Sequence, residues 1–422
     1  MGKRRVQFCI CRFPVLKWTE NFARQERGGG ILLKSKVAVV ECREYRQELV
    51  DEAVRKVVGL LGGWERFVGK EERILLKPNL LAKCPPEKAC TTHPQVFAAA
   101  GRALRKEGYP HLFFGDSPGN HLIGVEQTAQ GCGILPEARS LEIPTADFSE
   151  GEKVDFPEGH AADHFILCKG AREADAIINL CKMKTHQLER ITGAMKNTFG
   201  CVYGFNKGAS HARFPNADLF GQMIGDLNLL VKPRLHIMDG IVAMEGNGPQ
   251  SGEPVKMGLI LASADPVALD SVFCALVSLD PKLVPTNVYG QEYGVGTCEA
   301  AQIEVVTDGE TLTVEEAAVR WGNPDFKVER SADFKGRINM LRFFQPLLDR
   351  KPYIKKDRCV GCGICIQACP LEEKAIFFRG GKPAYHYRKC IKCYCCQEMC
   401  PKQAIDVKQT RLAKLADRNW RL

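Results

Sequence analysis

The chain has 422 residues, more than one hydrophobic core usually organises, and this length predicts two or three domains. Its composition, 45% hydrophobic and 26% charged, is that of a globular protein, and no apolar stretch approaches the roughly 18–20 residues of a membrane span. The net charge of +9 is unevenly spread, because residues 37–345 carry 33 basic and 41 acidic side chains, so we expect no nucleic-acid partner.

Residues 1–35 are predicted to be a disordered extension. They start with a basic, partly apolar run, but Arg12 and Pro14 interrupt it and no small-residue cleavage site follows, which argues against a signal peptide. Nine of the 20 cysteines lie between Cys359 and Cys400, a clustering typical of metal binding rather than of disulfides. We therefore expect a cytoplasmic protein.

From residue 36 to about 310, short β-branched runs alternate with amphipathic helical patterns. This rhythm predicts an α/β body whose mostly parallel sheet has helices on both faces. Asp265 before Pro266 is a typical helix start. The expected strands are Lys36–Glu41, Arg73–Leu76, His111–Phe114, His164–Leu167, Ala176–Leu180, Leu235–Met238, Gly258–Leu261 and Ile303–Thr307, and the expected helices are Gln47–Leu61, Pro94–Glu107 and Pro266–Ser278.

The C-terminal quarter of the chain divides into three segments. Residues 311–351 are predicted to be a linker that contains a helix at Ile338–Leu348, and residues 352–407 form a small cysteine-rich α+β domain. A hairpin with a Gly-Gly turn is expected between its two cysteine motifs, over residues 375–385. Residues 408–422 are a basic tail to which we assign no function.

Two complete cysteine motifs follow the pattern Cys-x2-Cys-x2-Cys-x3-Cys-Pro. Two-residue gaps let neighbouring thiolates converge on one small inorganic cube. Zinc is the alternative, because paired Cys-x2-Cys motifs also bind zinc, but each zinc takes only four thiolates and two four-cysteine runs that end in proline fit it poorly. The motifs begin at Cys359 and Cys390.

The cysteine-rich segment resembles the bacterial two-cluster ferredoxins, in which the fourth cysteine of each motif binds the other cluster. The resemblance implies two [4Fe–4S] clusters and an electron relay between them. Cys395 matches no ligand position. The implied ligands are Cys359, Cys362, Cys365 and Cys400 for cluster 1, and Cys369, Cys390, Cys393 and Cys396 for cluster 2.

The body resembles the domain of unknown function 362 family. The resemblance rests on Lys77-Pro-Asn-Leu, Thr92-His-Pro, Gly115-Asp-Ser-Pro, Lys182-Met-Lys-Thr-His, Gly193-Ala-Met-Lys-Asn-Thr-Phe-Gly and Met238-Asp-Gly-Ile-Val-Ala-Met-Glu. Members of this family often carry a C-terminal ferredoxin-like module, as this chain does. The family's chemistry is largely unassigned, so the resemblance implies a fold and little mechanism.

These polar segments each follow a predicted strand, and ligands of open α/β sheets bind beyond the carboxyl ends of strands. A crevice lined by several lysines would capture a carboxylate or phosphate, while solvated loop lysines are the simpler reading. The acidic residues could pair with these lysines or hold a divalent cation. The catalytic candidates are Lys182, Lys184, His186 and Asp239, and the substrate-binding candidates are Lys77, Asn79, Asp116, Lys196, Asn197 and Glu245.

The sequence leaves three functions open. The first is an oxidoreductase that passes electrons through two clusters to a small anionic substrate or cofactor in the body. The second is a ferredoxin-like carrier whose body docks a partner enzyme, and the third is an accessory protein for metalloenzyme maturation. We expect a redox donor or acceptor protein as a partner. Motifs for Rossmann dinucleotide binding, P-loop nucleotides, HExxH zinc hydrolysis and G-x-S-x-G catalysis are absent.

Overall fold

The computed structural model describes residues 34–119, 123–331 and 350–408. The described residues from Ser35 onward belong to one compact unit. The predicted helix at Ile338–Leu348, nearly all of the extension 1–35 and the tail beyond Lys408 lie outside the described residues. No described helix is long and apolar enough to cross a membrane.

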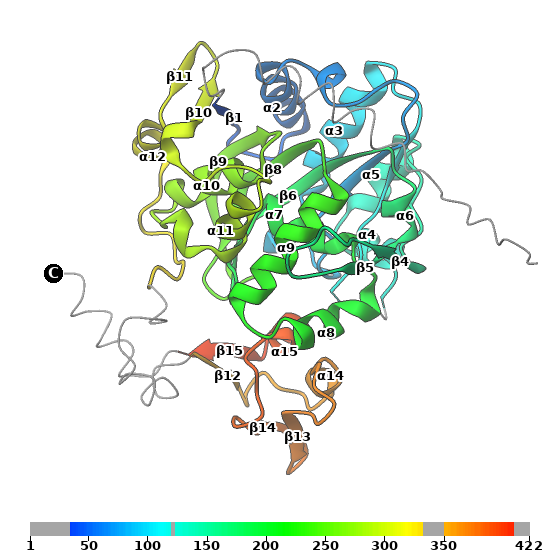
Figure 1. Cartoon of the computed structure of the whole chain (residues 1–422), viewed down its shortest axis with the longest axis vertical. Coiled ribbons are helices and arrows are strands. Elements are labelled where there is room, and N and C mark those ends of the chain that lie inside the picture. Colours follow the sequence, from blue (N-terminus) through cyan, green and yellow to red (C-terminus); the bar gives the residue numbers. More distant parts are fainter. Residues whose placement is uncertain (1–33, 120–122, 332–349, 409–422) are drawn as a thin grey trace, which may run out of the picture. The chain divides into compact units, whose positions relative to one another are not determined.

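The body is built on one large sheet with the strand order β11-β10-β1-β9-β8-β6-β2-β3, and β7 pairs with β6 outside this path (Figure 1). Strands β3, β2, β6 and β8 are parallel, as are β1 and β10, while β9 runs antiparallel to both of its neighbours. The strands are β1 (Ser35–Glu41), β2 (Ile74–Pro78), β3 (Leu112–Phe114), β6 (Ala176–His186), β7 (Arg190–Thr192), β8 (Leu235–Glu245), β9 (Glu253–Ser263), β10 (Ile303–Thr307) and β11 (Glu310–Leu312).

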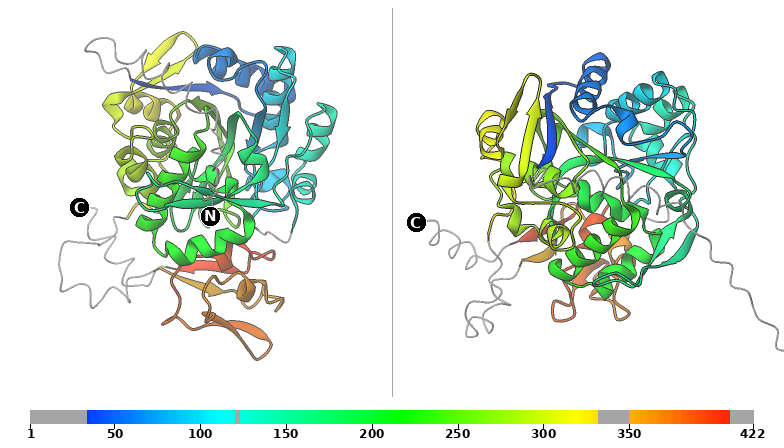
Figure 2. Two further views of the ribbon diagram at one scale, coloured as in Figure 1. Left: turned by 45° about the vertical axis from the view of Figure 1, so that its right-hand side comes forward. Right: turned by 45° about the horizontal axis from the view of Figure 1, so that its top comes forward.

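Helices cover both faces of this sheet, as predicted (Figure 2). On one face lie α2 (Gln47–Leu60), α3 (Pro94–Lys106) and α5 (Ile134–Ser140), whose apolar residues share a core with Ile74 and Leu76. Leu75 points to the opposite face, because successive strand residues alternate. That face carries α7 (Ala194–Asn197), α9 (Ala217–Val231), α10 (Pro266–Leu276), α11 (Pro285–Glu292) and α12 (Val314–Trp321).

Most of the expected elements are present, but β6, β8 and β9 extend well beyond the predicted strands Ala176–Leu180, Leu235–Met238 and Gly258–Leu261. The strand at His164–Leu167 belongs to β5 (His164–Cys168), which pairs with β4 (Gly151–Asp155) in a separate two-stranded sheet. Helix α12 lies inside the predicted linker, yet it packs against α10. The predicted helices did not include α4 (Val125–Gly131), α5, α6 (Lys169–Arg172), α7, α8 (Gly204–Arg213), α9 or α11.

The cysteine-rich module contains two short antiparallel pairs and two one-turn helices. Strand β12 (Lys351–Ile354) pairs with β15 (Ile405–Lys408), so both ends of the module meet. The predicted hairpin is present as β13 (Ile376–Arg379) and β14 (Lys382–Tyr385). Its Gly380-Gly381 turn has positive φ at both residues, which glycine adopts at little cost. The helices are α14 (Ile364–Gln367) and α15 (Cys395–Glu398).

Candidate functional site

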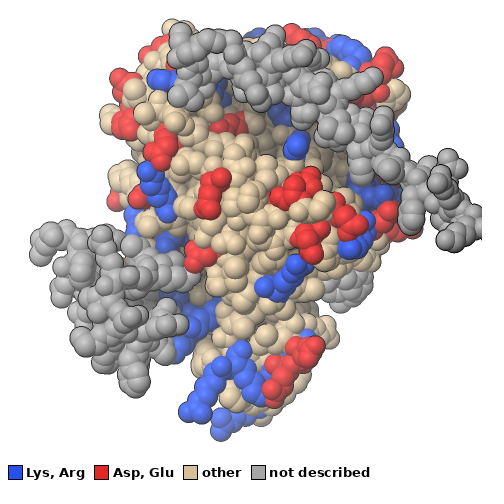
Figure 3. Space-filling model, viewed as in Figure 1, with Lys and Arg blue, Asp and Glu red and all other residues tan. Residues whose placement is uncertain are grey.

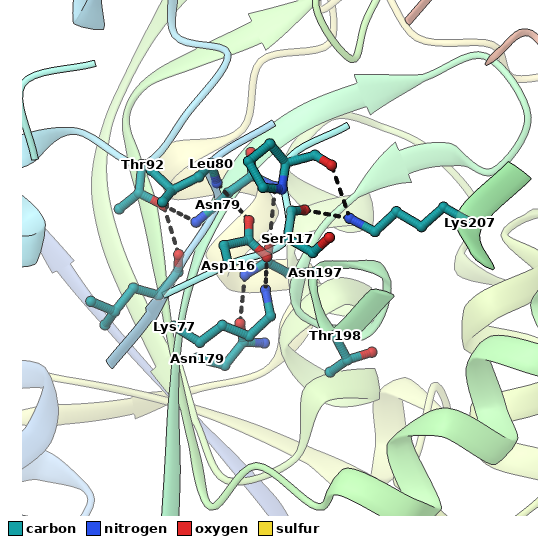
Figure 4. A network of polar contacts seen from close by, with 12 residues as sticks. Lys77, Asn79, Leu80, Thr92, Asp116, Ser117, Asn179, Asn197, Thr198 and Lys207 are labelled. Atoms are coloured by element: carbon teal, nitrogen blue, oxygen red, sulfur yellow. Dashed lines mark hydrogen bonds and ion pairs between the residues drawn. The ribbon is translucent and has the colours of Figure 1, made fainter. Parts of the chain in front are cut away.

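Strand β2 carries a buried lysine near its end, and this lysine is paired with an aspartate that follows the neighbouring strand β3. Lys77 Nζ donates to Asp116 Oδ1 at 3.0 Å, and neither side chain is exposed (Figure 4). The second carboxylate oxygen of Asp116 accepts the backbone N–H of Leu80 at 2.7 Å. The aspartate therefore neutralises a lysine that would otherwise be an isolated buried charge.

Gly200 leaves the space that this ion pair fills. A Cβ atom at Gly200 would lie 1.6 Å from Asp116 Oδ1 and 2.7 Å from Lys77 Nζ. We expect Gly200→Ala to lower the free energy of unfolding by about 1–3 kcal/mol, the usual cost of overpacking a core. The matched control is Gly59→Ala in α2, where a Cβ would meet no atom within 4 Å beyond the adjacent backbone of its own helix, so the change should stabilise the helix slightly. Equal urea-unfolding midpoints for the two variants would contradict this account.

A second buried ion pair joins β6 to β8. Lys182 and Asp239 are register partners, and Lys182 Nζ donates to Asp239 Oδ2 at 2.7 Å. The hydroxyl of Tyr45 donates to Asp239 Oδ1 at 2.8 Å, and the ring of Tyr45 stacks on His93. Burial lowers the pKa of Lys182 against the opposing pull of Asp239, and burial lowers the pKa of His93 to about 4. These groups satisfy one another, and the histidine is the N-cap of α3.

A chain of side-chain amides leads from Lys184 into the sheet. Lys184 Nζ donates to Asn79 Oδ1 at 2.9 Å, and the Asn79 amide donates to Asn197 at 2.8 Å. Asn197 then donates to Asn179 at 2.6 Å, and Asn179 contacts a ring nitrogen of His236. Each amide is therefore held in one orientation, so the two predicted asparagines are fixed parts of the site wall.

The predicted position of the lysines was wrong. Lys182 and Lys184 do not follow a strand as solvated loop residues but lie inside β6, whose eleven residues are all buried. Asp239 likewise lies in the middle of β8. Strands β6 and β8 extend beyond the apolar segments that predicted them. One reason is that β6 is paired with both β2 and β8, and the other is that its buried lysines donate to acceptors on neighbouring elements.

A cavity of about 350 Å³ lies between the body and the cysteine-rich module. This volume falls in the range of small-molecule sites. Five of the ten body candidates line it, and they are Asn79, Asp116, Lys184, Lys196 and Asn197. Four other candidates are buried and are not among its lining residues, and they are Lys77, Lys182, His186 and Asp239. Glu245 is also absent from the lining and is ion-paired with Lys327.

The cavity wall is rich in cations. Lys196 Nζ has no hydrogen-bond or ion-pair partner among the described residues and lies over the rings of Phe199 and Phe220. Lys207 donates to the backbone oxygen of Ser117. Burial lowers the pKa of Lys184 and of Lys207 to about 8 in each case, which still leaves most of both protonated at neutral pH.

Sequence reasoning missed three of the cavity's polar residues. Lys207 and His211 come from α8, and Lys374 comes from the module. The Nδ1 atom of the buried His211 has no hydrogen-bond partner, and burial lowers the pKa of this histidine to about 3, so the ring is neutral. No recognised motif surrounds these residues in the sequence.

His186 is a contact between the body and the module. Its Nδ1 accepts the backbone N–H groups of Leu188 and Glu189 at 3.1 Å, so Nε2 carries the proton in the neutral ring. Nε2 lies 3.0 Å from Glu398 Oε1. Burial lowers the pKa of His186 to about 4, and Glu398 has a pKa below its usual value because His186 and Lys196 outweigh the effect of its burial.

The glycine-rich turn between β8 and β9 also contacts the module. Gln397 is fully buried and donates to the backbone oxygen of Asn247 at 3.0 Å and of Gly248 at 3.3 Å. A Cβ atom at Gly248 would lie 2.1 Å from the backbone oxygen of Thr185. The absence of a side chain at Gly248 lets the backbone of this turn pack against β6, and the same turn accepts hydrogen bonds from the module.

The eight predicted cluster cysteines line two small cavities inside the module. The first cavity is lined by Cys359, Cys362, Cys365 and Cys400, together with apolar residues such as Ile354 and Ile405. The second is lined by Cys369, Cys390, Cys393 and Cys396. In each set the cysteine that precedes proline comes from the other motif. Four thiols around an apolar cavity are the donor set that a [4Fe–4S] cluster requires.

Cys395 differs from these eight. It is buried and lines neither of the two small cavities, but it lines the larger cavity between the module and the body. Among the described residues, no three His, Cys, Asp or Glu side chains are arranged to hold one metal ion. A cubane takes its thiolates at four separate corners, so this finding concerns mononuclear sites alone.

Family models match both parts of the chain. The model of the domain of unknown function DUF362 matches residues 74–275, and the model of a 4Fe-4S dicluster domain matches residues 351–401. The thylakoid-associated protein sll1697 of Synechocystis sp. is 36% identical over 265 residues, which cover 63% of this chain and 81% of that protein. The chain belongs to the DUF362 family. Its dicluster domain supports 4Fe-4S cluster binding and an iron–sulfur electron-carrier role.

Among solved structures, the lactate racemase apoprotein from Thermoanaerobacterium thermosaccharolyticum matches with a TM-score of 0.40 and 12% identity. The match covers 58% of this chain and 58% of that chain.

Proposed function

We propose that this DUF362 protein is an iron–sulfur oxidoreductase that reduces a small anionic molecule or cofactor bound between the body and the dicluster module. The donor is a redox protein that loses as many electrons as the bound acceptor gains. In this proposal the two sets of four cysteines described above hold two [4Fe–4S] clusters, which would supply one-electron transfer.

One observation carries this proposal: a single cavity is lined both by lysines of the body and by Cys369, a member of the second cysteine set. Lys196 is the cation best suited to hold an anion, because its Nζ has no hydrogen-bond or ion-pair partner among the described residues and the residue is only half-buried. Lys184 adds positive charge at the cavity wall while donating to Asn79. A concave, mostly apolar site with a few convergent cations binds carboxylates or phosphates well.

The other catalytic candidates have structural roles in this proposal. Lys182 and Asp239 neutralise each other inside the sheet, and His186 joins the body to Glu398 of the module. Lys207 and His211 are instead polar residues that line the cavity. Nδ1 of His211 has no hydrogen-bond partner, so it can form a hydrogen bond with a ligand. We assign no proton donor.

Two other functions fit the same domains. A ferredoxin-like carrier would use the body only to dock a partner, and a maturation accessory protein would deliver electrons or clusters to another metalloenzyme. A substrate-sized, lysine-lined cavity next to a cluster cysteine favours the oxidoreductase. A cytoplasmic location also stays a prediction, since the cyanobacterial relative is named as thylakoid-associated.

The test is reoxidation of the reduced protein. Full-length protein purified without oxygen is reduced with dithionite, freed of the reductant and mixed with panels of small carboxylates and small phosphate esters. We expect one panel to reoxidise the clusters, read by visible absorbance and EPR. Lys196→Ala should slow this reoxidation about tenfold, mainly through a higher KM, because a charged hydrogen bond to the anion is lost.

The matched control is Lys256→Ala, because Lys256 is exposed on β9 and lines none of the cavities described above. It should leave the rate unchanged. Clusters that no member of either panel reoxidises would support the carrier instead. An equal loss in both lysine variants would show that general surface charge, and not the cavity, governs the reaction.

A further inference from the structure

The module exposes part of the first cysteine set on its surface. Cys362 of that set is exposed, whereas Cys369 of the second set is buried and lines the cavity against the body. The two sets therefore face different surroundings. The first set lies next to solvent, where another protein can approach, and the second lies next to the proposed acceptor.

Apolar and glycine residues surround Cys362. Val360 and Phe378 are 63% and 54% exposed, which is unusual for large apolar side chains. Phe378 lies over Gly363, because a Cβ atom there would be 3.1 Å from the end of its ring. The hairpin turn approaches the same loop, since a Cβ at Gly361 would be 2.9 Å from the backbone oxygen of Gly381.

Basic side chains frame this apolar centre. Lys382 Nζ donates to the backbone oxygen of Lys356 at 2.8 Å, and Arg379 and Lys382 are register partners at the hairpin end. The exposed cations of this face, named at the end of this paragraph, have no ion-pair partner among the described residues. An acidic residue, Asp357, lies between Lys356 and Arg358 in the sequence. Figure 3 shows basic side chains gathered at the bottom of the view, in the region of β13 and β14, beside a small acidic group. The exposed cations of this face are Lys356, Arg358, Arg379, Lys382 and Lys402.

We propose that this face docks a small acidic electron-carrier protein, which reduces the cluster held by the first cysteine set. Charge complementarity selects the partner, because exposed cations without ion-pair partners beside an apolar centre attract a protein with acidic side chains around its own redox centre. Each transfer oxidises the carrier by one electron and reduces the cluster by one. The proposal does not rest on the bound acceptor, because cluster reduction is measured without any acceptor present.

The test uses the cluster-loaded full chain and an acidic ferredoxin as the probe. Calorimetry with the oxidised ferredoxin should show binding that weakens steeply from low to high salt. Arg379→Glu with Lys382→Glu should weaken binding at low salt at least about tenfold, because two attractions become repulsions. The same variant should slow cluster reduction by reduced ferredoxin and leave reduction by dithionite unchanged.

The matched control reverses two exposed lysines of the body, Lys106→Glu with Lys256→Glu, and should change neither binding nor rate. Iron content checks that each variant holds its clusters. If the charge-reversal variant loses its clusters, the salt dependence of binding by the unaltered protein still tests the proposal. Equal binding by both double variants, or salt-independent binding, would overturn it. The proposal would also be overturned if sedimentation showed that the face binds only a second copy of the chain, or if the face bound only anionic vesicles.

Discussion

Replacing Cys369 by alanine is expected to remove one cluster and leave the other. Iron should fall from about eight to about four atoms per chain, and the EPR spectrum of the reduced protein should lose the interaction between two cubanes. The reason is the crossover, because Cys369 belongs to the first sequence motif but lines the cavity of the second. Iron and sulfide analysis with EPR of anaerobically prepared protein measures both effects.

Cys395→Ala is the control for this prediction. Cys395 lies in the second motif and is as buried as the cysteines around it, but it lines neither small cavity. The variant should keep about eight iron atoms, since a cluster takes four ligands and each set already has four. Loss of iron in the Cys395 variant and not in the Cys369 variant would show that Cys395, and not Cys369, is the ligand. Zinc in place of iron would show that the cysteines do not hold iron–sulfur clusters.

The module was predictable because its information is local. Eight cysteines at two- and three-residue spacings define their cavities almost regardless of the rest of the chain. The hairpin turn was predictable for the same reason, because Gly380-Gly381 supplies the positive φ angles that a tight turn needs. In the body, alternating apolar patterns located most strands of the sheet, and Ile303–Thr307 has the predicted bounds.

The site in the body was only half predictable, because its geometry depends on distant partners. A strand prediction stops at Leu180, since the next residues include two lysines and a histidine. In the structure β6 continues to His186 because Lys182 finds Asp239, 57 residues away, and Lys184 finds Asn79, 105 residues away. No local pattern contains such pairings. Lys207 and His211 were missed for the same reason, as the packing of α8 alone brings them to the cavity.

Asp116→Ala should destabilise the protein more than any other substitution considered for the body. It leaves the fully buried Lys77 without its partner and the backbone N–H of Leu80 without an acceptor. Removing one member of a buried pair costs about 3–5 kcal/mol, because an uncompensated charge stays out of water. Urea unfolding of anaerobically prepared protein, compared at equal cluster content, measures the loss.

Two comparisons separate the buried charge from a general effect of losing an aspartate. Asp308→Ala breaks the exposed pair with Lys56 and should change stability little, because solvent already screens that pair. Adding Lys77→Met to Asp116→Asn replaces the buried charges by neutral groups while keeping an acceptor for Leu80, and this double variant should recover most of the stability. If the double variant were less stable than Asp116→Ala, Lys77 would have a role beyond neutralising the aspartate, and the adjoining cavity would be the place to look for it.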